Sequence, residues 1–507
     1  LGPALALLAA FLVAAAWAFR APWLGRVALA LAAFGVALVA WRLASPPDEP
    51  VLREVRSVGA LVLALAGAVT VAVAAALAAR PSGLRARAVT VDADQREALA
   101  SAWHALWTSR VVVWVAGVLA VLKLGTEPTV SPPAFSRPFG SLGDLLTAPA
   151  TAWDAGSYAT IAQGGYSQAE SLQAFFPLYP TLVRAGSRSP ETTIVVGIVV
   201  SLVAFAVALY LLHRLVALER GRDVAGLAVL LVAFSPLALF FSAVYTESLF
   251  LALSVGAFYA ARRGCWWLAG IAGGLAATTR VAGVLVLVPL AILYLYGPRG
   301  DRPAPASPAA RSLRPRFPLE PSAAWLLLVP AGTLAFAAYL GAHGDALAPL
   351  HMNERYWDRD FVPGLGALRG IEDAWLSLRE IAGSHALTTP SVETAGQLAD
   401  PMKLAGANLT DFAFLVFAVV ACVGAFRRLP AAYGAYVLAT IAVAVSSVPP
   451  YAPLTSAPRY LLVAFPCQVW LAIWASSSTG RRQASLLVSA GLLALFAAQF
   501  ASWRWVA

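Results

Sequence analysis

Residues 192–212 read TTIVVGIVVSLVAFAVALYLL and contain no charged side chain. A bilayer core of about 30 Å requires roughly 20 apolar residues of helix, so this run is long enough to cross a membrane. Comparable runs recur along the chain of 507 residues, of which 60% are hydrophobic and 12% charged. A water-soluble protein of this length does not have such a balance. The sequence therefore predicts an all-α polytopic membrane protein.

About thirteen or fourteen membrane-spanning helices fit the sequence. The first apolar run is also compatible with the remains of a signal peptide. The predicted spans begin near Leu5, Val27, Val58, Val111, Thr192, Val224, Ser248, Trp267, Val281, Ala324, Phe412, Ala431, Tyr460 and Ser485.

Arginines gather in alternate short loops, which the positive-inside rule places in the cytoplasm. Two long loops, residues 125–191 and 342–411, then lie outside the cytoplasm, and we expect them to carry amphipathic helices. The bias toward arginine over lysine is typical of a GC-rich bacterial genome, so the expected location is a bacterial cell membrane. The arginine-bearing loops contain Arg80, Arg85, Arg87, Arg96 and Arg110; Arg214, Arg220 and Arg222; Arg262 and Arg263; Arg299, Arg302, Arg311, Arg314 and Arg316; Arg427 and Arg428; and Arg481 and Arg482.

Four regions are predicted along the chain. Residues 1–109 form extra N-terminal spans and a cytoplasmic loop, and residues 110–296 form the first half of the core with the outer loop 125–191. Residues 297–322 are a Pro- and Arg-rich cytoplasmic linker. Residues 323–507 form the C-terminal half with the outer loop 342–411. The net charge of +10 is spread among loops, which argues against nucleic acid as a partner.

Asp154 is the most notable residue of the first outer loop. The segment reads WDAGSY at 153–158, IAQGGY at 161–166 and FFPLYP at 175–180. A helix here would place Tyr158 one turn after Asp154 and end at Gly164-Gly165, giving an amphipathic segment at the membrane surface. Asp154 could instead be a helix N-cap, and Trp153 and its aromatic neighbours an interfacial belt.

Three further charged residues lie within apolar sequence on the same predicted side. Glu247 follows Tyr245-Thr246, and an ionised carboxylate there is a functional candidate because it is costly unless paired or in a wet cavity. Arg280 and Arg459 break the positive-inside trend. Guanidinium groups bind phosphate in a bidentate manner, so they could hold a lipid-phosphate leaving group. The alternatives are a helix cap for Glu247, pairing between Glu247 and the arginines, and snorkelling to lipid headgroups.

The second outer loop contains His351 close to Glu354. A lone histidine beside a carboxylate, without further ligands at a metal-binding spacing, is weak evidence for a metal. The three cysteines show no paired spacing. We expect neither a metal nor another cofactor.

With these motifs in view, the chain resembles the PIG-V-like mannosyltransferases, relatives of the second mannosyltransferase of glycosylphosphatidylinositol anchor synthesis. The resemblance covers roughly residues 110–471. It is carried by Trp153-Asp154, Tyr158, Ile161-Ala162, Gly165-Tyr166, Phe175 to Pro180, Tyr245 to Phe250, Thr279-Arg280 with Gly283, Trp357 with Arg359 and Pro363, and Arg459-Tyr460 with Pro466. The extra spans before Val111 depart from the usual pattern.

This resemblance implies a GT-C glycosyltransferase fold and a polyprenyl- or dolichyl-phosphate mannose donor. It implies that Asp154 is the catalytic base of an inverting transfer to a lipid or glycan acceptor outside the cytoplasm. We expect Arg280 and Arg459 to bind the donor phosphate and Glu247 to orient Arg280. Trp153, Tyr158, Tyr245, Arg359 and Tyr460 are expected to bind or support the substrates.

Two other functions remain open from the residues. A related GT-C enzyme could use another lipid-linked sugar, and a transporter or flippase of a lipid-linked saccharide would belong to a different class. A transporter should place its buried charges near the bilayer midplane, whereas these charges concentrate at one predicted face. The sequence does not indicate a partner subunit, and it does not identify the acceptor.

Overall fold

The computed structural model describes residues 93–127, 134–302, 315–388 and 396–506. The chain divides into two units. Residues 97–136 and 145–507 form one unit, which holds every feature discussed below. The described part of the other unit is limited to residues 93–96 and 137–144. The predicted spans near Leu5, Val27 and Val58, the arginines 80, 85 and 87, and linker residues 303–314 lie outside the described residues.

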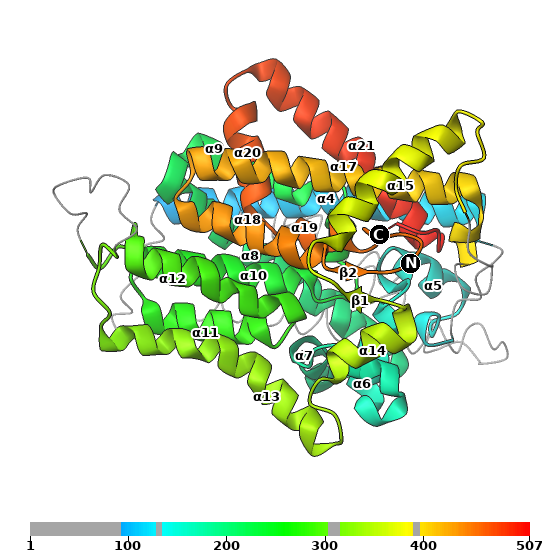
Figure 1. Ribbon diagram of the computed structural model, residues 1–507, viewed down its shortest axis with the longest axis horizontal. Coiled ribbons are helices and arrows are strands. Elements are labelled where there is room, and N and C mark those ends of the chain that lie inside the picture. The colour runs from blue at the N-terminus through cyan, green and yellow to red at the C-terminus, as the bar shows by residue number, and fades with distance from the viewer. Residues whose placement is uncertain (1–92, 128–133, 303–314, 389–395, 507) are drawn as a thin grey trace, which may run out of the picture. The chain divides into compact units, whose positions relative to one another are not determined.

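Nearly all regular structure is helical, as predicted (Figure 1). Two short strands pair antiparallel, Asp360 with Val448 and Phe361 with Ser447. The α-helices are α4 (Ala93–Leu124), α5 (Ser141–Thr151), α6 (Ala155–Gly164), α7 (Leu178–Gly186), α8 (Pro190–Arg220), α9 (Arg222–Ala233), α10 (Glu247–Arg262), α11 (Trp266–Ala277), α12 (Leu287–Tyr296), α13 (Leu328–Ala342), α14 (Ala348–Trp357), α15 (Leu365–Ile381), α17 (Pro401–Arg428), α18 (Ala431–Ala444), α19 (Ala457–Leu462), α20 (Pro466–Ala475) and α21 (Thr479–Ala501); the strands are β1 (Asp360–Phe361) and β2 (Ser447–Val448).

Among the described residues, five helices are long and apolar enough to cross a membrane: α4, α8, the 3₁₀ turn Pro321–Leu327 continued by α13, α17 and α21. The runs predicted to begin near Val224, Ser248, Trp267, Val281 and Ala431 form shorter helices instead. The run from Tyr460 is divided between α19 and α20, where Pro466 begins the second helix. Such interruptions are tolerated in a membrane protein where the irregular backbone is buried or lines a cavity.

One interruption, between α9 and α10, is held by a buried arginine of α4. Arg110 is 2% exposed. Its Nη1 donates 2.7 Å hydrogen bonds to the carbonyl of Ala238 and to the hydroxyl of Ser242, and Nη2 donates to the carbonyl of Ala233 at 3.2 Å. These carbonyls lie at or beyond the end of α9, where the helix no longer pairs its own backbone. Arg110 therefore fixes the segment that leads to Glu247.

Three of the arginine-bearing loops, those at the ends of α8, α10 and α12, meet at the opposite end of α10 from Glu247. Arg262 pairs with Glu219 at the end of α8 and donates to the carbonyl of Pro298 after α12. The hydroxyl of Tyr433 also donates to Glu219, at 2.8 Å. α10 has 16 residues, so its ends lie about 24 Å apart along the helix axis. For these three loops the grouping agrees with the pattern predicted from the sequence. The prediction of such a loop is wrong for Arg96 and Arg110, because both lie within α4 and Arg110 contacts the segment that leads to Glu247.

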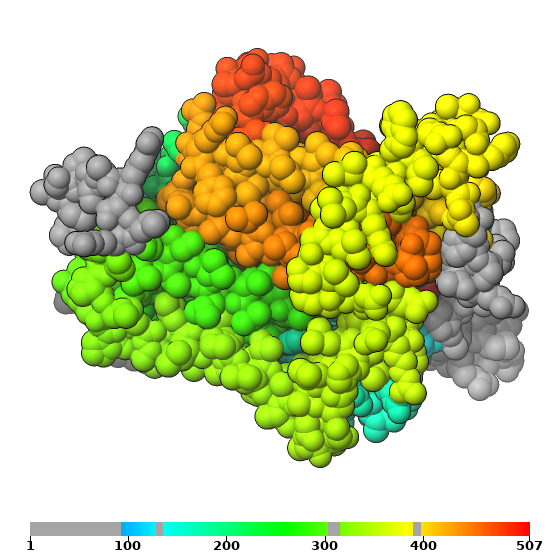
Figure 2. Space-filling view, viewed as in Figure 1, coloured from blue at the N-terminus to red at the C-terminus, as the bar shows by residue number. Residues whose placement is uncertain are grey.

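The second long loop carries an amphipathic helix, as predicted. α15 packs its small residues toward α17 and β2, and a Cβ added at Gly366 would lie 2.7 Å from the carbonyl oxygen of Val445. The opposite face of α15 exposes Leu368, Ile371, Trp375, Leu378 and Ile381. Figure 2 shows the yellow α14–α15 segment beside the orange α18–α19 segment.

Within the first long loop, the helix that follows Asp154 differs from the predicted amphipathic segment at the membrane surface. α6 does follow Asp154, and the N–H of Gly165 caps it by donating to Ile161. Tyr158 and Ile161 are both buried, however. Because α7 and α8 also pack against α6, the helix is enclosed by protein and does not lie on the surface.

Candidate active site

Asp154 lies at a strained turn just before α6. The preceding residue, Trp153, has φ 59°, a left-handed conformation that is unfavourable for a bulky side chain. Asp154 occupies the N-cap position, but its side chain makes no capping hydrogen bond. Its backbone N–H instead donates to the hydroxyl of Tyr245, which in turn donates to the carbonyl of Ala152, both at 3.0 Å. The carboxylate is therefore free of the capping role that the sequence left open.

The carboxylate of Asp154 pairs with Arg459 of α19. Arg459 Nη1 donates to Asp154 Oδ2 at 2.7 Å. The same guanidinium donates from Nε and Nη2 to Glu247 Oε1, at 3.1 and 3.0 Å. Arg459 thus bridges two acidic side chains that stand at the beginnings of α6 and α10.

Glu247 is completely buried and serves a second arginine. Arg280 Nη1 lies 2.7 Å from Glu247 Oε1. Arg280 Nη1 and Glu247 Oε2 are both buried, and this ion pair compensates the charge of Arg280. The guanidinium of Arg280 also lines the neighbouring cavity, where it can bind an anion.

These groups face one cavity of about 470 Å³. Eight of the nine residues predicted for the site line it, and Glu247 lies directly behind the two arginines that it contacts. The lining residues predicted from sequence are Trp153, Asp154, Tyr158, Tyr245, Arg280, Arg359, Arg459 and Tyr460.

Aromatic rings hold the two arginines of the cavity in place. The guanidinium of Arg459 lies 4.9 Å from the ring centre of Tyr245, and that of Arg280 lies 5.3 Å from the ring centre of Tyr460. The ring of Tyr158 is buried edge-on against Phe175 and Tyr179, and its hydroxyl lies 3.4 Å from the Thr246 hydroxyl. Tyr158 and Tyr179 are interior positions, so the predicted alternative of an interfacial aromatic belt does not describe them.

Arg359 reaches the same cavity from the second long loop. Its Nη2 donates to the hydroxyl of Ser456 at 2.9 Å. Ser456 has φ 66° and immediately precedes α19, the helix that carries Arg459. One left-handed residue therefore positions two arginines of the cavity.

His351 does not pair with its sequence neighbour Glu354. Its Nδ1 lies 2.7 Å from Asp345 Oδ2, and this contact lowers the pKa of the Asp345 carboxyl. Glu354 lines the cavity instead. Within the described ranges, no three His, Cys, Asp or Glu side chains are grouped as metal ligands would be.

The C-terminal tryptophans were not predicted as part of this site. Trp503 and Trp505 pack on Trp153, with ring centres 5.5 and 5.6 Å apart, and Trp505 also lines the cavity. The paired tryptophans in WRW at 503–505 are the only sequence signal for this contact. Without a spacing that relates them to Asp154, the sequence could not place them there.

Residues 122–293 match the family model described as Mannosyltransferase (PIG-V). The matched segment includes Asp154, Glu247 and Arg280, whereas Arg359 and Arg459 follow it. No curated protein and no solved structure matches the chain. The helical fold and this match define a membrane glycosyltransferase of the GT-C type. More specifically, the match confirms the predicted resemblance to the PIG-V-like mannosyltransferases over these residues.

Proposed function

We propose that the protein transfers mannose from a polyprenyl- or dolichyl-phosphate donor to a hydroxyl of a lipid-linked or cell-envelope glycan. The reaction takes place outside the cytoplasm and inverts the anomeric configuration. The observation that supports this best is the bridge from Arg459 to Asp154 and Glu247 at one cavity that Arg280 also lines. A carboxylate and guanidinium groups are the chemistry that such a transfer needs at its two ends.

Asp154 is the proposed general base. Arg459 engages Oδ2 and thereby orients the carboxylate, and the side chain is 31% exposed toward the cavity. The remaining oxygen can accept the proton of the acceptor hydroxyl. As that oxygen forms its bond to the anomeric carbon, the bond from this carbon to the phosphate oxygen breaks, and the electron pair leaves with the lipid phosphate.

Arg280 and Arg459 are the proposed phosphate-binding groups. Negative charge grows on the phosphate as the glycosidic oxygen departs, and fixed guanidinium donors in a partly dehydrated site stabilise that charge strongly. Glu247 compensates both arginines before the donor arrives, so it keeps them in place at low cost. Arg359 adds a third cation to the cavity lining.

The test uses protein in nanodiscs, radiolabelled polyprenyl-phosphate mannose and a panel of lipid and glycan acceptors. Asp154→Asn should lower the rate of mannose transfer by about two orders of magnitude or more, as expected for loss of a general base. The rate of the slower hydrolysis of the donor should fall by a similar factor. Asp223→Asn, an exposed substitution in the first turn of α9, is the matched control and should leave turnover unchanged.

Two results would contradict the proposal. Turnover that Asp154→Asn does not affect would remove Asp154 from the mechanism. Absence of turnover with mannose, arabinose and glucose donors alike would favour transport of a lipid-linked saccharide.

A further inference from the structure

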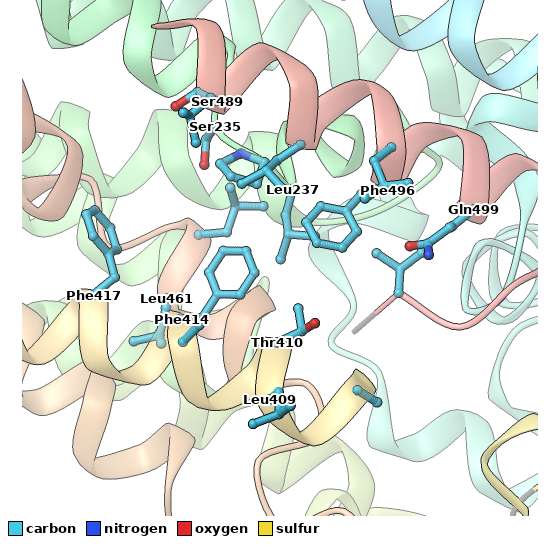
Figure 3. A pocket seen from close by; sticks show the side chains of 18 of the residues that line it. Ser235, Leu237, Leu409, Thr410, Phe414, Phe417, Leu461, Ser489, Phe496 and Gln499 are labelled. Atoms are coloured by element: carbon cyan, nitrogen blue, oxygen red, sulfur yellow. The ribbon is translucent and has the colours of Figure 1, made fainter. Parts of the chain in front are cut away.

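A second, larger cavity lies between α17 and α21. It is an apolar groove of about 960 Å³. Figure 3 shows Leu409, Phe414 and Phe417 of α17 on one wall and Phe496 of α21 on the other. Gly406 also lines it, and a Cβ added there would meet no atom within 4 Å, so space is open along this wall.

The groove has a polar end and an apolar body. Glu127 is buried at the polar end, with Lys403 Nζ 3.2 Å from its Oε1 and Arg504 Nε 3.5 Å from its Oε2. Away from these charges, the lining follows α17 and α21 mainly through aliphatic and aromatic side chains. An amphiphile suits this arrangement, because its headgroup can stay at the charged end while its chain is buried along the helices.

The polar end of the groove adjoins the catalytic cavity. Trp505 and Val506 line both cavities and therefore form a common wall. Gln397 ties this wall down, since its Nε2 donates to the carbonyl of Trp503 at 2.6 Å and its Oε1 accepts from the N–H of Trp505 at 3.0 Å. A ligand in the groove thus lies one layer of side chains from the reacting groups.

The common wall stands on the Asp154 side of the catalytic cavity. Trp505 packs on Trp153, the residue before Asp154. Arg280 lies at the other end of the charged cluster, beyond Arg459 and Glu247. In an inverting displacement, the attacking oxygen and the leaving phosphate are on opposite sides of the anomeric carbon. A groove that adjoins the cavity beside the base is therefore placed to bind the acceptor, whose hydroxyl oxygen attacks the anomeric carbon.

We infer that the groove between α17 and α21 is the site that holds the hydrocarbon chain of a lipid acceptor, with the headgroup hydroxyl directed to the catalytic cavity. This inference rests on the proposed function, which assigns the base to Asp154 and the donor phosphate to the arginines. The hydrocarbon chain of the donor lipid then leaves the catalytic cavity on the Arg280 side. The common wall of Trp505 and Val506 separates the donor lipid from the acceptor lipid.

The experiment uses hexadecyl α-mannoside with a diazirine near the end of its chain as the probe. After illumination of the full chain in nanodiscs, labelled peptides are mapped by mass spectrometry. The label should fall on the groove-facing residues of α17 and α21, and saturating polyprenyl phosphate should not displace it. Gly406→Leu should reduce labelling about tenfold, because its side chain occupies space that the probe's methylene groups would fill.

Gly491→Leu is the matched control. Gly491 is an exposed glycine of α21 outside the groove lining, with no atom within 4 Å of an added Cβ, and its substitution should not change labelling. Displacement of the probe by polyprenyl phosphate would assign the groove to the donor and overturn the inference. Labelling elsewhere, or equal labelling of wild type and Gly406→Leu, would also overturn it. Because labelling requires no turnover, failure of the proposed reaction is detected separately, in the Asp154→Asn assay.

Discussion

Arg459 and Asp154 lie 305 positions apart in the chain and are joined by a hydrogen bond of 2.7 Å. The guanidinium that makes this bond also donates twice to Glu247. The planar fork of arginine allows all three bonds at once, whereas the ammonium of lysine is a single point of donation. The geometry of the cavity therefore depends on the kind of cation at position 459 as well as on its charge.

Arg459→Lys should lower kcat by about two orders of magnitude, comparable to removing one preorganised donor from an anion site. The retained charge should leave the protein folded, which size-exclusion chromatography in detergent would check. The measurement is single-turnover transfer from radiolabelled donor. Near wild-type kcat in this variant would show that charge alone suffices and that the bridge to Asp154 has no part in the reaction.

Glu247→Gln should destabilise the protein by about 3–5 kcal/mol, because it leaves the nearly buried guanidinium of Arg280 without the charge that compensates it and leaves Arg459 with Asp154 alone. Adding Arg280→Gln should recover part of this loss, since one of the uncompensated cations is then removed. Denaturant unfolding of both single variants and the double variant in detergent measures the coupling. Strictly additive losses would mean that Glu247 and Arg280 do not interact energetically.

Glycine and alanine substitutions at Ser456 should differ in their effect on stability but not in their effect on activity. Ser456→Gly removes the hydroxyl bound by Arg359 but suits the left-handed backbone, whereas Ser456→Ala removes the hydroxyl and keeps the strain. The glycine variant should be the more stable by about 1 kcal/mol. Both should lower kcat/KM about tenfold through the lost hydrogen bond to a charged group.

Thermal unfolding and steady-state transfer test these two expectations separately. Equal stability of the glycine and alanine variants would show that the left-handed backbone at Ser456 is not strained. Unchanged kcat/KM in both variants would remove its hydroxyl from the positioning of Arg359.

The raised pKa of Asp373 in α15 predicts that the stability of the protein depends on pH. Burial, helped by the neighbouring carboxylate of Glu372, raises the pKa of Asp373 to about 6. The folded state thus binds the proton more tightly than the unfolded state, where the pKa is about 3.9. The stabilisation by protonation is complete below that lower value and is lost as the pH rises through 6.

Asp373→Asn stays neutral throughout, so its Tm relative to wild type should rise between pH 5 and pH 7. Thermal unfolding of both proteins from pH 4 to pH 8 makes the comparison. A difference in Tm that is constant with pH would show that Asp373 does not titrate in this range.

The sequence could predict the helical class and the main charged residues of the site for one physical reason. Ionised groups are rare in apolar sequence, so Asp154, Glu247, Arg280 and Arg459 stand out individually. Pairing of Glu247 with the arginines was among the predicted alternatives. The bridge from Arg459 to both carboxylates could not be predicted, because it depends on how α6, α10 and α19 meet.

The lengths of the helices were predicted less well for a similar reason. Hydrophobicity reports which residues can lie in lipid, but it does not report where a helix ends inside the protein. The end of α9 depends on Arg110, which is 128 positions away from the carbonyl of Ala238 that it binds. The Trp153 stack with Trp503 and Trp505 is equally nonlocal, since no periodic pattern links the two segments.

The position of Arg110 also bears on how the chain is assembled during biogenesis. An arginine within a helix that enters lipid alone has no partner for its charged donors, and its insertion carries a free-energy cost. Among the residues that the structure describes, the acceptors of Arg110 beyond its own helix are Ala233, Ala238 and Ser242, which are translated later. The charged donors of Arg110 in α4 can therefore be bound only after the segment following α9 has been translated. The cavity end of the protein, to which that segment leads, can form only after these two distant parts of the chain have come into contact.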